Sequence, residues 1–197
     1  MDITTRLGRR VRALRDARAL SLEALADRSG VSRSNISLIE RGESSPTATV
    51  LDKLAGGLGV TLASLFEDET PAVEPAPIAR LADQPVWTDP ASGYMRRNVA
   101  PAGASPIQLV DVVFPPGQRV AYDDATRAAE THQLVWMIEG TMELAVGQGQ
   151  WRLEAGDCLA MRLDGPISYH NPTTRPARYA VALVTSPLQM APRRPKP

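Results

Sequence analysis

The sequence contains very little cysteine and no long apolar run. Cys158 is the only cysteine among the 197 residues, which excludes a disulfide framework and a zinc site built from thiolates. Because it lies in an apolar, strand-like run, we expect Cys158 to be a small core residue. No apolar stretch approaches the roughly 20 residues that cross a membrane, and the N-terminus lacks the apolar core of a signal peptide. We therefore expect a cytoplasmic protein without a membrane partner.

The chain also has no excess charge of either sign, since 22 basic side chains balance 22 acidic ones. Its overall charge therefore does not indicate a nucleic-acid partner. The first 45 residues differ, with nine arginines against six acidic residues, and six of these arginines lie between Arg6 and Arg18. This local charge of +3 favours a surface that faces phosphates; a solvated helix face is the alternative.

A short helix with two distinct faces is predicted directly after Ser32. Ser32 can cap its start, and Gly42 lies just beyond its last turn. Ile36 and Ile39 fall on one face, three residues apart. The opposite face is small and polar. A helix this short needs neighbours to hold it, and its polar face suits contact with base edges in a groove.

The preceding residues predict a second short helix over 22–28, with Ser21 as its N-cap. Ser29 and Gly30 then form a turn in which glycine permits a positive φ. A helix-turn-helix unit needs a small residue where its two helices cross, a glycine in the turn, and an apolar residue that anchors the second helix. Ala26, Gly30 and Ile36 meet these three requirements. A generic helical hairpin is the alternative interpretation.

Three further helices complete a predicted N-terminal domain of residues 1–68. The first carries an apolar stripe with helical spacing. The fourth is capped by Thr47 and is expected to end at the glycines 56, 57 and 59. The fifth covers residues 61–67. Five helices of this size can just form one compact domain.

The composition changes after this domain. Residues 69–84 contain closely spaced prolines and are predicted to be an extended linker. Residues 85–187 contain short β-rich runs separated by turn signals, which indicates an antiparallel sandwich or barrel. The tail 188–197 has little to bury, and we expect it to be disordered. The predicted strands are Ile107–Phe114, Gln133–Glu139, Thr141–Val146, Trp151–Leu153, Cys158–Met161 and Arg178–Val184.

The run LADRSGVSRSNISLIERG resembles the XRE family of phage-repressor and Cro-like helix-turn-helix proteins. This resemblance implies an ion pair between Arg15 and Glu40 that braces the recognition helix. It also implies that the polar face of that helix contacts base edges, while donors near the helix ends contact phosphates. The implied base contacts are Arg33, Ser34 and Ser37, and the phosphate contacts are Ser21, Ser32, Asn35 and Arg41.

From about Val86 to Ser186 the chain resembles a cupin, a small jelly-roll barrel. Glu139-Gly140 and Gly156-Asp157 are spaced like the turns of the two cupin motifs, and Asn171 falls where the second motif has its asparagine. The residues at the positions of the metal ligands differ from those of a cupin. Gln133 stands in place of the glutamate, and Ile167 in place of one histidine. The other two histidines are replaced by Arg127 and Ala129 or, with the alternative spacing, by Thr126 and Ala128. Alternation along the strands also turns His132 and His170 away from the interior. We therefore expect neither a metal nor another cofactor.

The expected fold is thus an all-α helix-turn-helix domain followed by an all-β cupin barrel. We predict a non-enzymatic transcriptional regulator that binds a double-stranded DNA operator as a homodimer and responds to an unidentified small molecule. Trp136 is expected to pack against a neighbouring sheet or subunit. The alternative is an iron-dependent oxygenase or epoxidase with the same two-domain layout. The predicted effector pocket is lined by Gln133, Val135, Met137, Met161, Arg162, Ile167 and Tyr169, unless these residues only fill the barrel.

Overall fold

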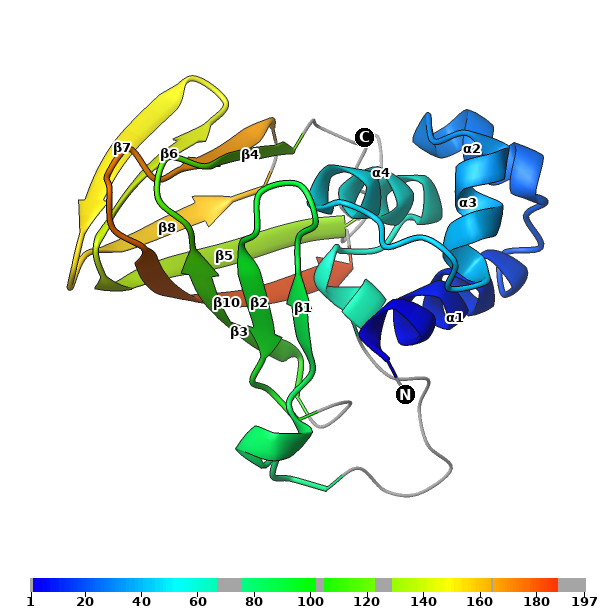
Figure 1. Ribbon diagram of the computed structural model, residues 1–197, viewed down its shortest axis with the longest axis horizontal. Coiled ribbons are helices and arrows are strands. Elements are labelled where there is room, and N and C mark those ends of the chain that lie inside the picture. Colours follow the sequence, from blue (N-terminus) through cyan, green and yellow to red (C-terminus); the bar gives the residue numbers. More distant parts are fainter. Residues whose placement is uncertain (1, 67–75, 102–104, 123–128, 164, 188–197) are drawn as a thin grey trace, which may run out of the picture.

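The chain folds into a helical domain and a β domain that lie against each other (Figure 1). The computed structural model describes residues 2–66, 76–101, 105–122, 129–163 and 165–187. The predicted tail 188–197 and the first part of the predicted linker, residues 69–75, lie outside this range. The rest of the linker contains a short 3-10 helix, η2 (Leu81–Asp83), which the proline pattern did not predict. No helix in the described part of the chain has the length and apolar character needed to span a membrane.

Four α-helices and one 3-10 helix make up the helical domain. The side chains of Ser21, Ser32 and Thr47 each accept a hydrogen bond from a backbone N–H in the following first turn, which confirms three predicted helix starts. The predicted fifth helix is only a 3-10 turn, in which the Thr61 side chain accepts a hydrogen bond from the Ser64 N–H. The elements are α1 (Ile3–Asp16), α2 (Leu22–Ser29), α3 (Arg33–Glu40), α4 (Ala48–Leu58) and η1 (Ala63–Phe66).

The helices enclose an apolar core and approach each other closely. Gly8 of α1 lies against α3 so tightly that a Cβ atom there would be 2.2 Å from the carbonyl oxygen of Ile39. Of the three glycines predicted to end α4, Gly59 caps the helix, whereas Gly56 and Gly57 lie within it. The fully buried apolar side chains include Leu7, Val11, Leu25, Ile36, Ile39, Leu51, Leu54 and Leu58.

The β domain consists of two antiparallel sheets. The larger has the order β1 (Val86–Thr88), β2 (Met95–Asn98), β3 (Ile107–Phe114), β10 (Ala177–Pro187), β5 (Ala129–Glu139) and β8 (Cys158–Arg162). The smaller has the order β4 (Arg119–Tyr122), β9 (Ile167–His170), β6 (Thr141–Val146) and β7 (Gly149–Glu154). Strands β3 to β10 form an eight-stranded jelly roll, the cupin architecture, and β1 and β2 extend its larger sheet. This confirms the predicted fold class.

Alternation along the strands decides which side chains enter the jelly roll. Val135 and Met137 of β5 are buried, as are Ile167 and Tyr169 of β9, which confirms the predicted inward faces. The prediction for Cys158 was wrong, because its side chain is exposed. In β8 only Met161 is buried, so Cys158 and Ala160 both lie on the outer face of the sheet.

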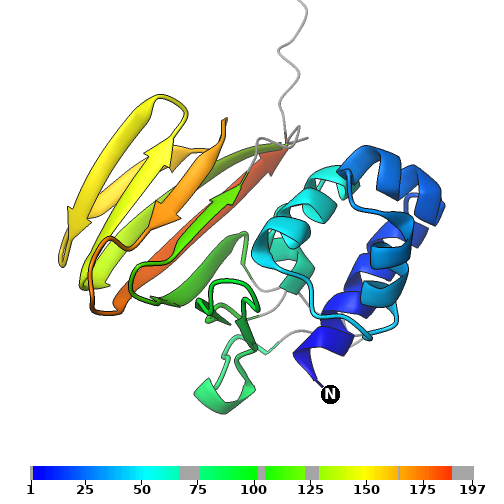
Figure 2. The ribbon, with the colours of Figure 1, turned by 45° about the horizontal axis from the view of Figure 1, so that its top comes forward.

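Direct contacts join the two domains. The carboxylate of Asp89, just after β1, accepts a hydrogen bond from the N–H of Ala48 at the start of α4, at 2.9 Å. The rings of Phe66 and Trp87 meet edge to face, with centroids 5.6 Å apart. Figure 2 shows α4 next to the jelly roll, with α2 and α3 farther out. The fold therefore places the recognition helix on the side of the molecule remote from the sheets.

Candidate DNA-binding surface and interdomain cavity

Helices α2 and α3 form a helix-turn-helix unit with its polar face open to solvent. Gly30 ends α2 in the left-handed conformation, with φ at 67°, which turns the chain into α3. Ile36 and Ile39 are completely buried against the domain core. On the other face of α3, Arg33 and Ser34 are exposed and Ser37 is half-buried. The three predicted base-contacting residues thus lie on one accessible surface.

An ion pair holds the C-terminal end of α3 against α1. The Arg15 guanidinium donates to both carboxylate oxygens of Glu40, at 2.7 and 2.9 Å. The two side chains are only 12% and 7% exposed. The hydrogen bond with Glu40 raises the pKa of Arg15 above its ordinary value. This geometry confirms the predicted ion pair and fixes the angle at which α3 is presented.

The predicted phosphate-contacting residues lie around the same unit. Ser21 and Ser32 occupy the exposed N-terminal ends of α2 and α3, where free backbone N–H groups favour an anion. Asn35 is half-buried in the first turn of α3. Arg41 follows the last turn, where its guanidinium donates to Glu43 at 2.8 and 2.9 Å and to the Ser37 hydroxyl.

The interior of the jelly roll does not fit the metal site of a cupin. The side-chain amide of Gln133 donates to the Tyr169 hydroxyl at 2.6 Å, and Ile167 offers no ligand atom. His132 is exposed on the outer face, and His170 contacts Glu143 at 3.0 Å. Within the described residues, no three side chains of His, Cys, Asp or Glu form a cluster that could hold a metal ion. Positions 126–128 lie outside the described range.

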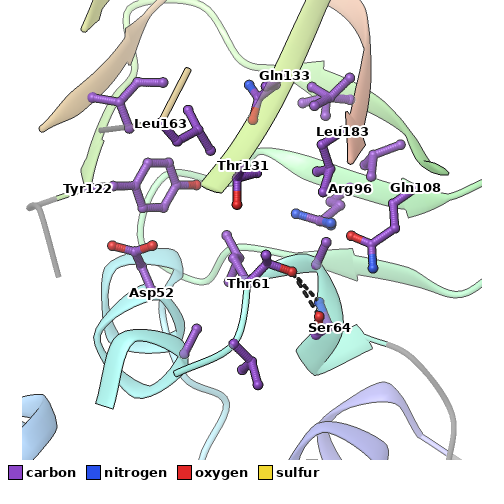
Figure 3. A pocket seen from close by; sticks show the side chains of 18 of the residues that line it. Asp52, Thr61, Ser64, Arg96, Gln108, Tyr122, Thr131, Gln133, Leu163 and Leu183 are labelled. Carbon is purple, nitrogen blue, oxygen red and sulfur yellow. Dashed lines mark hydrogen bonds between the residues drawn. The ribbon is translucent and has the colours of Figure 1, made fainter. Parts of the chain in front are cut away.

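A cavity of about 330 Å³ lies where the helical domain meets the open end of the jelly roll. Residues from the end of α4 to η1 form one wall, and strands from both sheets form the other. Figure 3 shows Thr61 and Ser64 on the helical side and Thr131 and Gln133 on the strand side. A ligand in this cavity would therefore touch both domains.

The cavity differs from the predicted effector pocket. Gln133, Ile167 and Tyr169 line it. Val135, Met137 and Met161 are buried farther along the jelly roll and do not line it, because the domain core fills that region. Arg162 does not line the cavity either, since strand alternation places its side chain on the exposed outer face. Three of the seven predicted residues therefore line this cavity and four do not, and their role in binding an effector stays a prediction.

Other lining residues were missed by sequence reasoning. Strand β2 is short and polar, so the sequence around Arg96 did not indicate a strand. The residues that α4 contributes to the cavity wall could not be predicted, because they depend on how the two domains pack. Alternation within two predicted strands did point inward: Tyr179, Val181 and Leu183 alternate in one strand, and Gln108 belongs to the alternating positions of strand 107–114. The missed residues include Asp52, Thr61, Ser64, Tyr94, Arg96, Gln108, Tyr122, Thr131, Tyr179, Val181 and Leu183.

The cavity is mostly apolar and carries few charges. Burial raises the pKa values of Tyr94, Tyr122 and Tyr179, so their hydroxyls stay neutral at pH 7. The hydroxyls of Tyr94 and Tyr122 are hydrogen-bonded to each other at 3.1 Å. Among the lining residues within the described ranges, Asp52 is the only acidic side chain and Arg96 the only basic one. An apolar cavity with a few convergent polar groups is typical of a small-molecule site.

Comparison with known proteins identifies the helical domain. Residues 11–65 match the model of the HTH_3 helix-turn-helix family. The HTH-type transcriptional regulator y4dJ of Sinorhizobium fredii is 38% identical over 73 residues, which cover 36% of this chain and 95% of that protein. The capped two-helix unit and these matches define a helix-turn-helix protein. The chain belongs to the HTH_3 family, the XRE family that its sequence resembles.

A comparison of structures covers nearly the whole chain, and a further sequence match covers about a third of it. An HTH_3 family transcriptional regulator from Vibrio cholerae has the same fold, with a TM-score of 0.70 at 22% identity over 92% of this chain and 96% of that one. The immunity repressor protein of Bacillus phage phi105 is 34% identical over 64 residues, which cover 32% of this chain. The chain spans 44% of the length of that repressor.

Proposed function

We propose that the protein is a sequence-specific transcriptional regulator that reads its operator with α3. The main observation that supports this proposal is that α3 buries Ile36 and Ile39 completely and leaves its polar face in solvent. The Arg15–Glu40 ion pair stiffens this presentation. Arg33 is the candidate for a bidentate guanine contact, with Ser34 and Ser37 beside it. Its ion pair with Glu23, at 3.8 Å and highly exposed on both sides, is weak enough to be exchanged for a base.

Phosphate contacts position this helix in the groove. The hydroxyls of Ser21 and Ser32 lie at helix N-termini, where the helix dipole favours a negative group. Asn35 and Arg41 add an amide and a guanidinium along α3 and its end. Such contacts supply affinity and register, whereas the base contacts supply sequence preference.

The proposed functional unit is a homodimer that packs through the outer face of the larger sheet. Leu134, Trp136 and Ile138 of β5 are 46%, 52% and 38% exposed, and Leu109 of β3 is 38% exposed. Between these strands, the small side chain of Ala182 in β10 lies opposite both Leu134 and Leu109. A second copy is the occupant that suits an operator with two half-sites, since a two-fold axis pairs one patch with itself.

The role we propose for the jelly roll is control of DNA binding, without catalysis or a metal. The interdomain cavity supports this role because a ligand bound there would contact α4 and the strands together. Such a ligand shifts the population of domain arrangements when it binds one of them more tightly. We therefore propose the domain junction as the effector pocket, with Gln133, Ile167 and Tyr169 in its wall.

The replacement Arg33→Ala tests the DNA assignment. Selection from random duplexes would first give the preferred operator of the wild-type protein. Loss of one bidentate contact should then cost about 1–3 kcal/mol of discrimination at one base pair. Arg152→Ala is the control, because Arg152 lies on β7 at the far end of the jelly roll. An unchanged sequence preference removes Arg33 from the interface, and failure to bind any duplex at low salt contradicts the regulator itself.

A further inference from the structure

Arg96 brings a buried positive charge to the wall of the interdomain cavity. Its side chain extends from β2 and the residue is only 8% exposed. The guanidinium stacks over the Phe66 ring, 4.6 Å from the centroid, and its Nε donates to the Asn98 side-chain oxygen at 3.3 Å. Figure 3 shows its nitrogens next to Gln108, directed into the cavity.

One end of this guanidinium lacks a partner. The Nη2 atom is buried and forms no hydrogen bond with any residue that the structure describes. Across the same described ranges, no carboxylate is recorded in an ion pair with Arg96. Burial lowers the pKa of Arg96, yet an arginine side chain remains charged in proteins. A buried cation with an unused donor is unfavourable until an anion pairs with it.

The other residues that line the cavity indicate which anion would fit beside Arg96. A planar guanidinium matches a carboxylate in a bidentate arrangement. Among the cavity-lining residues that the structure describes, Arg96 is the only basic one, which favours one negative charge over the two of a phosphate monoester. Asp52 lies on the opposite side of the cavity and would repel a second negative group (Figure 3). Between them the wall is apolar and aromatic, with Val112, Phe114 and Tyr179.

We propose that the interdomain cavity binds a small monocarboxylate, with its carboxylate on Arg96 and an apolar body against the aromatic wall. This assignment rests on the proposed function, because it names the chemical class of the effector. The apolar body would reach the helical side of the cavity, where the Thr61 and Ser64 hydroxyls are 2.9 Å apart. Binding would thus join the two walls and restrict how α4 lies on the jelly roll.

The test compares acids with their uncharged amides on the full-length protein without DNA. The probes are hexanoate and phenylacetate, each with its amide, and affinity is measured by calorimetry and by the rise in melting temperature. At least one acid should bind about tenfold or more tightly than its amide, because a hydrogen bond to a charged group is lost in the amide. Adipate should bind more weakly than hexanoate, because its second carboxylate approaches Asp52.

Two variants connect the acid preference with Arg96. Arg96→Gln should weaken binding of the acid about ten- to a hundredfold, to the level of the amide. The control Arg97→Gln removes the neighbouring charge, which does not line the cavity, and should leave binding unchanged. Equal affinity for acid and amide in the wild type overturns the proposal, as does binding of neither acid at millimolar concentration or full retention of the preference in Arg96→Gln.

Operator binding by the ligand-free protein is measured separately. A protein that binds its operator but discriminates no acid from its amide would contradict only the ligand assignment. A protein that prefers the acid but binds no duplex would contradict only the proposed regulator.

Discussion

The carboxylate of Asp89 in the β domain caps helix α4 of the helical domain by accepting the N–H of Ala48 at 2.9 Å. Asp89 is 2% exposed, and its second oxygen accepts the Ser92 N–H, also at 2.9 Å. A buried carboxylate at a helix N-terminus is favoured by the helix dipole and by the free N–H groups. The position of α4, and with it one wall of the cavity, is therefore fixed by a specific contact.

Replacing Asp89 should loosen this junction. In Asp89→Ala the buried N–H of Ala48 and the groups around Ser92 lose their acceptor, at a cost of about 1–3 kcal/mol. Hydrogen exchange of the Ala48 amide should become faster, and the urea midpoint of unfolding should fall. Asp83→Ala, at an exposed position, is the control and should change neither quantity. Unchanged exchange at Ala48 in Asp89→Ala would show that the cap does not hold the domains.

The ion pair between Arg15 and Glu40, which holds α3 against α1, gives a second prediction. In Glu40→Ala, Arg15 loses both hydrogen bonds to this nearly buried carboxylate but keeps its contact with Asp16 at 2.7 Å, so the free energy of unfolding should fall by about 1–3 kcal/mol. Glu43→Ala removes an equally close but exposed ion pair with Arg41, and we expect no measurable loss of stability. Urea unfolding followed by circular dichroism measures both. A similar effect for the two variants would contradict the bracing role of Glu40.

These two contacts also show what the sequence could predict. The N-caps and the glycine turn of the helical domain are local, because each depends on residues within one or two turns of the chain. The Arg15–Glu40 pair spans 25 positions, and the family resemblance, with its fixed helix arrangement, made it predictable. The Asp89–Ala48 contact spans 41 positions and two domains, and no periodicity in the sequence encodes it.

The site was predictable to the extent that strand alternation determines it. Alternation placed Gln133, Ile167 and Tyr169 inward, but it could not tell which depth of the barrel remains open. Cys158 was misplaced because composition alone cannot decide which face of a strand is buried. Arg96 was missed for a different reason. It lies in a four-residue polar strand, and its burial depends on Phe66 of the other domain.

The end of α3 provides a prediction about salt. If Arg41 contacts a phosphate, Arg41→Ala should weaken binding of all sequences by a similar factor. The slope of log affinity against log salt should fall by about 1 per protomer, and by about 2 for a dimer. Titrations at several salt concentrations, with specific and random duplexes, separate this effect from the altered base preference expected for Arg33→Ala. An unchanged slope would mean that Arg41 keeps its partner Glu43 in the complex.

The outer face of the larger sheet gives the last prediction. Trp136 is 52% exposed beside Leu134 and Ile138, an arrangement that a second copy would bury. A carboxylate introduced by Trp136→Glu would lie unpaired in such an interface, so the variant should be a monomer in sedimentation equilibrium and should bind its operator more weakly. Trp151→Glu is a matched control, since Trp151 is 41% exposed but lies on β7 of the other sheet. A dimer that survives Trp136→Glu, or one that is lost in Trp151→Glu, would place the two-fold axis elsewhere on the molecule.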